Sequence, residues 1–282
     1  MEFLNKNRNK DDLEVLGKIC FDTITSPYVS KPNSDEFCGI YIESRNRELT
    51  CIEDLAAIKS FKIFSEHNYP VLVFCNNFSN FLGNHKDVKD WRIQFIKINE
   101  CQSHDDYSLF MIKQLFKIIP KEYENIIFLH NDGFLIKSGW ENYLKEINVD
   151  YIGSPWAHTP SIDIFDDDIK KWKPLNFQPI NVGGGGFSFR KLSKFRKISE
   201  EYSGFILRER YREDNRWPPE DLFFSNILNG TGIGKVADIK QAIRFSLDPI
   251  TLIEYLRKSS FGFHYPTYKN NFQQYREYHL SL

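Results

Sequence analysis

The sequence predicts an α/β protein with a mostly parallel central sheet flanked by helices. Over residues 37–153, short apolar runs typical of buried strands alternate with segments whose apolar residues recur at helical spacing. This alternation is the pattern of parallel strands joined by crossover helices. In addition, the apolar run Ile126–Leu129 leads into Asn131-Asp132-Gly133, and open α/β sheets present ligand groups where strands end in this way.

Each element follows from local signals. Strands are predicted from apolar runs bounded by turn residues, at Phe37–Ile42, Val71–Phe74, Trp91–Ile96, Ile126–Leu129 and Asp150–Gly153. A helix is expected to begin at the capping box Ser103-His104-Asp105-Asp106 and to end at Pro120. Further helices are indicated by amphipathic spacing or by residues that favour a helix start, near Ile52–Ile63, Gly139–Lys145, Leu192–Tyr202 and from Pro219-Glu220-Asp221 onward.

Length and composition set the broad class. Residues 1–35 are expected to form a helical leader and linker, and residues 36–282 a single domain. The formal net charge of −1 provides no global basic field, so no nucleic-acid partner is expected. The five cysteines are odd in number and widely spaced, no signal segment opens the chain, and no apolar run is long enough for a transmembrane segment. These features predict a cytoplasmic, reducing compartment.

Two segments are candidates for binding a ligand through polar groups. Asp132 follows a predicted buried strand, although Asn-Asp-Gly is also common chemistry for an ordinary turn. The run Gly183-Gly184-Gly185-Gly186 lacks the residues of a Walker loop and lies too far along the chain for a dinucleotide fingerprint. It either brings backbone N–H groups against a phosphate or a sugar hydroxyl, or forms a bulged, tight connection.

Two further candidates carry titratable groups. Glu220 and Asp221 fall in the first turn of a predicted helix, where capping and the helix dipole alone account for acidic residues. The same dipole would hold a carboxylate ionised, which suits a general base. His264 lies among aromatic residues near the C-terminus, a setting more typical of a core histidine than of a ligand.

In this order, the segments together resemble the glycosyltransferases of the GT-A fold. His130-Asn131-Asp132, the glycine run, Pro219-Glu220-Asp221 and His264 correspond to an Asp-x-Asp motif, a glycine loop, an acidic motif that opens a helix and a C-terminal histidine. An under-characterised bacterial and viral branch, with a single Asp after the strand, is similar in Tyr151–Trp156, Val182–Arg190 and Phe261–His264. The similarity covers residues from about 37 to about 268, and the first Asp of the motif is replaced by His130.

The resemblance implies that a sugar is transferred from a nucleotide-diphosphate sugar to a hydroxyl of a glycan or another acceptor, in glycan or surface-polysaccharide synthesis. It also implies that Asp132 and His264 hold a divalent cation with the diphosphate oxygens. Mn²⁺ is favoured over Mg²⁺ because the ligands mix oxygen and imidazole.

The remaining roles also follow from the resemblance. Residues expected at the donor nucleotide are Ile42, Glu43, Ser44, His130 and Asn131. The glycines Gly183, Gly184, Gly185 and Gly186 would approach the donor sugar or the acceptor. Asp221 would be the general base and Glu220 would orient the sugar if the reaction is inverting, whereas a retaining enzyme needs no such base.

Two alternatives stay open. A metal-dependent phosphoesterase or nucleotidyltransferase would also use Asp132 and His264, but would turn over nucleotides without an acceptor sugar. A catalytically inactive carbohydrate-binding scaffold would explain the missing first Asp, while Glu220, Asp221 and His264 argue against it.

Overall fold

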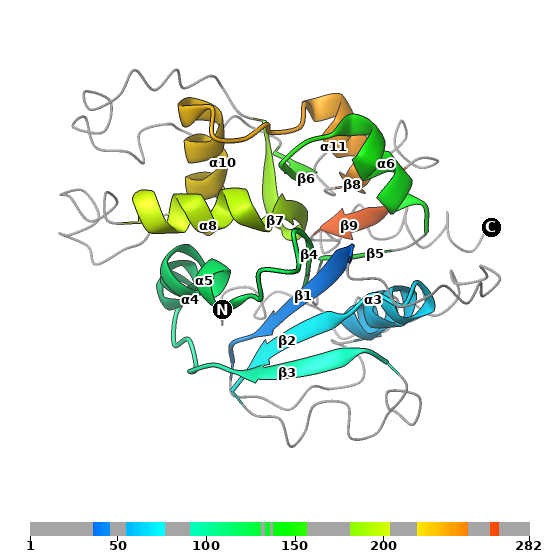
Figure 1. Cartoon of the computed structure of the whole chain (residues 1–282), viewed down its shortest axis with the longest axis vertical. Coiled ribbons are helices and arrows are strands. Elements are labelled where there is room, and N and C mark those ends of the chain that lie inside the picture. The colour runs from blue at the N-terminus through cyan, green and yellow to red at the C-terminus, as the bar shows by residue number, and fades with distance from the viewer. Residues whose placement is uncertain are drawn as a thin grey trace, which may run out of the picture.

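The computed structural model describes residues 36–45, 55–76, 91–130, 133–135, 138–156, 181–203, 219–247 and 260–264. These residues form a six-stranded sheet between two layers of helices, with a three-stranded sheet beside it (Figure 1). The strand order is β3-β2-β1-β4-β7-β6 in the main sheet and β5-β9-β8 in the small sheet. The predicted leader, residues 1–35, lies outside the described residues.

The main sheet is mostly parallel, as the sequence predicts. Its parallel strands pair in unbroken register and are β1 (Phe37–Glu43), β2 (Val71–Cys75), β3 (Ile93–Lys97) and β4 (Asn125–Leu129). β7 (Val182–Lys191) is antiparallel to β4, and β6 (Tyr151–Pro155) is antiparallel to β7. The carboxyl ends of β1–β4 and β6 therefore share one edge of the sheet with the amino end of β7.

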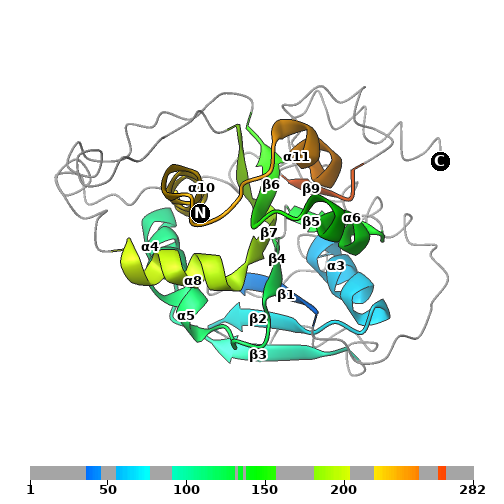
Figure 2. The ribbon, with the colours of Figure 1, turned by 45° about the horizontal axis from the view of Figure 1, so that its top comes forward.

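Helices cover both faces of the sheet (Figure 2). One face carries α3 (Leu55–Glu66), α6 (Trp140–Ile147) and α11 (Ile239–Phe245), beside the strands of the small sheet, β5 (Gly133–Leu135), β8 (Ser246–Leu247) and β9 (Gly262–His264). The other face carries α4 (His104–Phe110), α8 (Leu192–Glu201) and α10 (Glu220–Thr231). A π-helical turn, η2 (Met111–Leu115), continues α4 into α5 (Phe116–Ile118).

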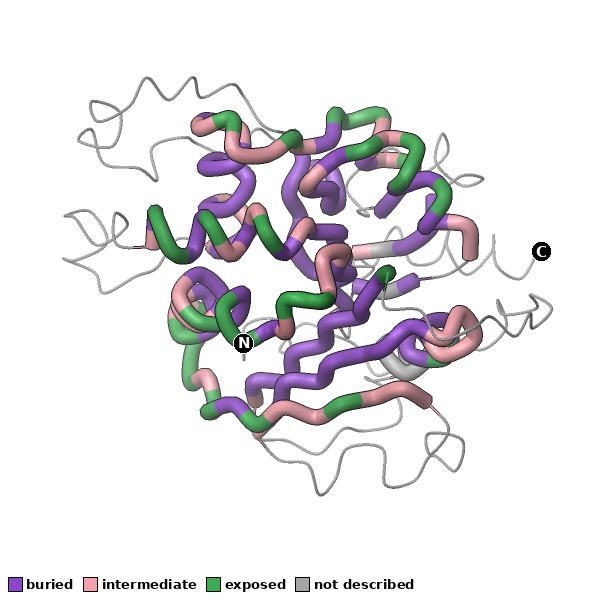
Figure 3. The backbone as a smooth tube through the Cα atoms, in the orientation of Figure 1, coloured by how far each residue is buried: buried purple, intermediate pink, exposed green. Residues whose placement is uncertain are grey.

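The central strands are buried on both faces (Figure 3). Cys38 and Ile40 pack into one apolar cluster, while Phe37 and Tyr41 pack into the other, because successive side chains of a strand point to opposite faces. Two buried faces are what a parallel sheet covered by helices requires. The predicted capping box is confirmed, since Ser103 and Asp106 bond each other's backbone N–H groups.

Among the described residues, no helix is long and apolar enough to cross a membrane. Cys38, Cys75 and Cys101 carry free thiols. The other two cysteines, Cys20 and Cys51, lie outside the described residues.

Candidate active site

The end of β1 is one part of the shared edge. Ile42, Glu43 and Ser44, the residues expected at the nucleotide, are all buried here. The Glu43 carboxylate accepts hydrogen bonds from Arg45, at 2.8 Å from Nε and 2.7 Å from Nη2. Glu43 therefore holds the positively charged guanidinium of Arg45 at the end of β1. Arg45 was not among the predicted site residues. An acid and an arginine two residues apart at a strand end could have predicted this ion pair.

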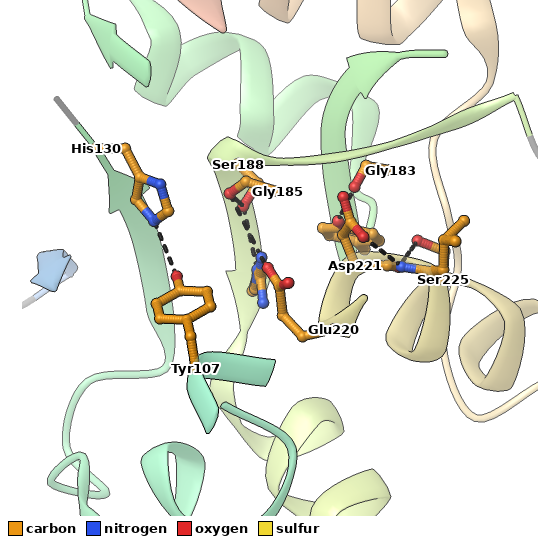
Figure 4. A network of polar contacts seen from close by, with 11 residues as sticks. Tyr107, His130, Gly183, Gly185, Ser188, Glu220, Asp221 and Ser225 are labelled. Carbon is orange, nitrogen blue, oxygen red and sulfur yellow. Dashed lines mark hydrogen bonds and ion pairs between the residues drawn. The ribbon is translucent and has the colours of Figure 1, made fainter. Parts of the chain in front are cut away.

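The end of β4 is the next part of the edge. His130 Nε2 lies 3.0 Å from the hydroxyl oxygen of Tyr107 in α4 (Figure 4). His130 and Gly133 exchange backbone hydrogen bonds, at 2.7 and 3.3 Å. The residues between them, Asn131 and Asp132, lie outside the described residues, so their predicted roles stay predictions. Gly133 pairs with His264 across β5 and β9.

The glycine run is part of a strand, which corrects the glycine loop that the resemblance implies. Gly183–Gly186 form the first half of β7, and all four residues are buried. Ile152 of β6 pairs with Phe189 of β7, and Ser154 pairs with Gly184. The pairing therefore advances by two residues along β6 but by five residues along β7. The extra residues form a β-bulge, a device that re-aims a strand and often accompanies active sites.

Side chains of the candidate site lie directly on this bulge. A Cβ atom at Gly186 would collide with the imidazole ring of His264. A Cβ atom at Gly185 would lie 2.8 Å from Glu220 Oε1 and 3.2 Å from the Asp221 Cβ. A Cβ at Gly184 would also meet His264, so positions 184 and 186 face the histidine while position 185 faces the two acids, and these groups flank the bulge from opposite sides. Glycine is needed at positions 185 and 186 so that these side chains can approach the backbone.

Trp156 also lies near the bulge. It directly follows β6 and belongs to the aromatic-rich segment Tyr151–Trp156 noted in the sequence. Its ring occupies the space beside Gly183, next to the Ser225 hydroxyl of α10. The Tyr151 hydroxyl donates to the Gly183 carbonyl at 2.6 Å, and Ser225 Oγ donates to the Asp221 carbonyl at 2.5 Å. These contacts connect β6, β7 and the first turns of α10.

The acids begin α10, as predicted, but they do not cap it by a side chain, and the N-cap residue is Pro219. Asp221 keeps some surface exposure, yet the protein atoms around its carboxyl group raise its pKa to about 7. Burial is the main cause and the charge of Glu220 the second, opposed by the N–H groups of Leu222 and Gly185 and by Arg190. Burial and the charge of Glu220 therefore outweigh the helix terminus in setting the pKa of Asp221.

A divalent cation would need ligands at this edge. Among the residues that the structure describes, no three His, Cys, Asp or Glu side chains gather as a metal site. His264 fits one such ligand by its chemistry, because an imidazole nitrogen binds divalent transition metals, and its ring is held against the backbone of Gly186. Its strand partner Gly133 directly follows Asp132 in the sequence, which is consistent with the predicted pair of ligands.

The architecture defines a class of protein. The chain is similar to core-mannan synthase A from Aspergillus fumigatus in its Mn/GDP form, with a TM-score of 0.50 and 10% identity over 76% of this chain and 74% of that one. The chain has the GT-A fold, as the sequence predicts.

Two other solved structures are less similar. One is mannosyltransferase Ktr4p from S. cerevisiae in complex with GDP, with a TM-score of 0.42 and 11% identity over 82% of this chain and 71% of that one. The other is TarS from S. aureus in complex with UDP-GlcNAc, with a TM-score of 0.40 and 9% identity over 81% and 58%. No curated protein matches the chain.

The amino-acid sequence assigns the chain to a protein family. Residues 90–264, more than half of the chain, match the family described as "Protein of unknown function (DUF5672)", and the chain belongs to it. This range includes β4, the glycine bulge, the acidic pair and His264.

Proposed function

We propose that this protein is a glycosyltransferase that moves a sugar from a nucleotide-diphosphate sugar to a hydroxyl of a glycan or another acceptor. One observation carries the proposal: Glu220, Asp221 and His264 converge on the glycine bulge of β7. This convergence lies at the edge where an open α/β sheet binds its ligands. Neither a capping role for the acids nor a core role for the histidine requires such a meeting point.

Asp221 is proposed as the general base of an inverting reaction. A base works best when its pKa is near the working pH, because it is then both available and strong enough to take a proton. With a pKa of about 7, Asp221 meets this condition near neutrality. Its carboxylate would take the proton of the acceptor hydroxyl as the oxygen bonds to the anomeric carbon. Glu220, next to it on the bulge, would orient the sugar.

The leaving nucleoside diphosphate would be held on the other side of the bulge. Asp132 and His264 would hold a divalent cation, with Mn²⁺ favoured over Mg²⁺ because imidazole is one of the ligands. When bound, such a cation offsets the charge that develops on the diphosphate. Ile42, Ser44 and the Arg45 guanidinium fixed by Glu43 would flank the nucleotide at the end of β1.

A transfer assay over a panel of UDP- and GDP-sugars, with glycan acceptors and with Mn²⁺, Mg²⁺ or EDTA, tests the proposal. Formation of a glycosylated acceptor in step with nucleotide release is expected, and it should be fastest with Mn²⁺. Nucleotide turnover that never requires an acceptor would favour a phosphoesterase or nucleotidyltransferase. Carbohydrate binding without turnover of any donor would favour an inactive scaffold.

A further inference from the structure

Arg190 is a fully buried cation that the proposed chemistry does not use. Its side chain has no exposed surface. Its guanidinium lies on aromatic rings, with Cζ 4.0 Å from the ring centroid of Phe128, 5.2 Å from that of Phe195 and 5.5 Å from that of Tyr151. Burying a guanidinium is costly unless hydrogen bonds and an opposite charge accompany it, and stacking offsets only part of that cost.

The polar contacts of Arg190 all lead to the glycine bulge and the acidic pair. Its partners Gly185, Ser188 and Glu220 are labelled in Figure 4. Nε donates to Ser188 Oγ at 3.1 Å, and Nη2 donates to the Gly185 carbonyl at 3.4 Å. The same Nη2 atom lies 3.7 Å from Glu220 Oε1. Ser188 Oγ also donates to the Gly185 carbonyl, at 2.9 Å. Two donors thus fix one carbonyl of the bulge.

The Gly185 residue connects Arg190 to Asp221. Its carbonyl is held by Arg190 and Ser188, while its N–H group donates to the Asp221 carboxylate. Arg190 therefore reaches Glu220 through an ion pair and Asp221 through one backbone residue. A planar guanidinium can direct several donors at once, whereas the point charge of a lysine cannot do so in the same geometry.

We infer that Arg190 is the positioning residue of this site: from inside the aromatic cluster it holds Glu220 by charge and, through Gly185, sets the position of Asp221. The inference deepens the proposed function and rests on it. Arg190 has no access to the surface, so it touches neither donor nor acceptor. Its effect on transfer passes through the two acids.

The test compares Arg190→Met, Arg190→Lys and Glu220→Gln with the matched control Arg196→Met. Unlike the fully buried Arg190, Arg196 is only partly buried, and its guanidinium donates to the carbonyls of Phe116 and Ile119, away from the bulge. We expect kcat of Arg190→Met to fall roughly 10²-fold, the usual effect of a small misplacement of reacting groups. The donor KM should stay near that of the wild type. Arg190→Lys should recover only part of the loss, and Arg196→Met should lower the melting temperature but not kcat per folded molecule.

The double variant Arg190→Met/Glu220→Gln separates positioning from simple damage, because it removes both buried charges and leaves neither unpaired. If Arg190 acts through Glu220, the double variant should lose no more activity than the more impaired single variant, a non-additive cycle. Fully additive losses would overturn the inference. So would a wild-type kcat in Arg190→Met, or losses that follow only the folded fraction, as in Arg196→Met.

The pH dependence gives a readout that a merely structural role would not move. Among the described residues, Asp221 is faced by Glu220 of its own helix, Arg190 of β7 and the Tyr151 hydroxyl of β6. Without the positive charge of Arg190, the acid limb of the kcat profile should move to higher pH in Arg190→Met and stay unchanged in Arg196→Met. An unmoved limb in both variants would count against the inference.

Failure of the proposed function looks different from failure of the inference. If wild-type protein transfers no sugar under any condition, the proposed function is wrong. The inference is then judged by melting temperatures alone. The difference in melting temperature between pH 5 and pH 8 should change in Arg190→Met and stay that of the wild type in Arg196→Met. Equal pH differences in all three proteins would overturn it.

Discussion

The two halves of the ligand edge are built differently. On the β1–β4 side, parallel strands pair in unbroken register, and their polar ends follow directly from where each strand stops. On the β7–β6 side, the strand runs in the opposite direction and bulges, and the polar groups come from α10 and β9, far away in sequence. The regular half supplies a fixed platform, whereas the irregular half brings the titratable groups together.

Glycine shows the same contrast. A Cβ at Gly39 in β1 would lie 3.1 Å from a methyl group of Val71 and 3.2 Å from the Phe64 ring, so this glycine serves apolar packing. A Cβ at Gly186 in β7 would meet the ring of His264, so that glycine serves the site. One residue type thus stabilises the sheet in one half and admits functional side chains in the other.

The largest expected effect is that of Asp221→Asn on the irregular half. Transfer should fall by roughly 10²- to 10⁴-fold, the usual contribution of a general base. Calorimetric titration should show unchanged affinity for UDP, since the base contacts the acceptor, and the melting temperature should not fall. Near-normal transfer would favour Glu220 as the base or a retaining mechanism. A large fall in melting temperature with a proportional loss of activity would support a purely structural role.

Asp132→Ala tests whether the two halves cooperate at a cation. Titration of UDP in the presence of Mn²⁺ should give the affinity seen in EDTA, because the carboxylate expected on the metal is gone, and His264→Ala should weaken Mn²⁺-dependent binding in the same direction. Circular dichroism serves as the folding control. Wild-type Mn²⁺ dependence in Asp132→Ala would remove this residue from the metal site.

A matched pair of glycine substitutions tests most directly whether the two halves of the edge use glycine differently. Gly186→Ala should displace His264 and weaken Mn²⁺-dependent UDP binding roughly 10- to 10²-fold, the range typical for disturbing the support of a metal ligand. Gly39→Ala should leave binding per folded molecule unchanged and lower stability by about 1–3 kcal/mol through overpacking. Calorimetry and thermal melting of both variants distinguish the two effects. If both lose only stability, the two halves do not differ as described.

The smallest expected effect concerns pH. The pKa of Asp221 in the folded protein, about 7, lies above its ordinary value of 3.8, so between these pH values the folded protein holds a proton that the unfolded chain has released. The corresponding stability is fully present below pH 3.8 and is lost as pH rises through about 7. Relative to the wild type, Asp221→Asn should therefore gain several degrees in melting temperature between pH 5 and pH 8. Parallel melting curves for the two proteins would show that Asp221 has no raised pKa.

Much of the regular half could be predicted from sequence alone. Apolar runs and a capping box gave the strands and the start of α4, because these signals act within a few residues of one another. The sequence offered both a ligand-binding loop and a bulged connection for the glycine run and could not decide between them, because both have the same local sequence. Only the contacts of Gly185 and Gly186 with α10 and β9 distinguish them.

The raised pKa of Asp221 could not be predicted for a related reason. A helix start predicts stabilisation of negative charge, but burial and the neighbouring charge of Glu220 outweigh it here. Arg190 belongs to the segment Val182–Arg190 that was noted in the sequence. Its burial could not be predicted, because the aromatic rings around its guanidinium come from other elements.

The π-helical turn between α4 and α5 also has a consequence for the site. Tyr107 and Phe116 are nine residues apart, and at about 100° per residue an unbroken α-helix would point them in opposite directions. The wider turn at Met111–Leu115 changes this phase. The continuous helical segment from α4 to α5 can therefore direct the Tyr107 hydroxyl to His130 and also place the Phe116 ring 5.9 Å from Cζ of Arg190. Deleting a single residue in this turn would rotate one contact out of place, so the length of the segment matters here as much as its side chains.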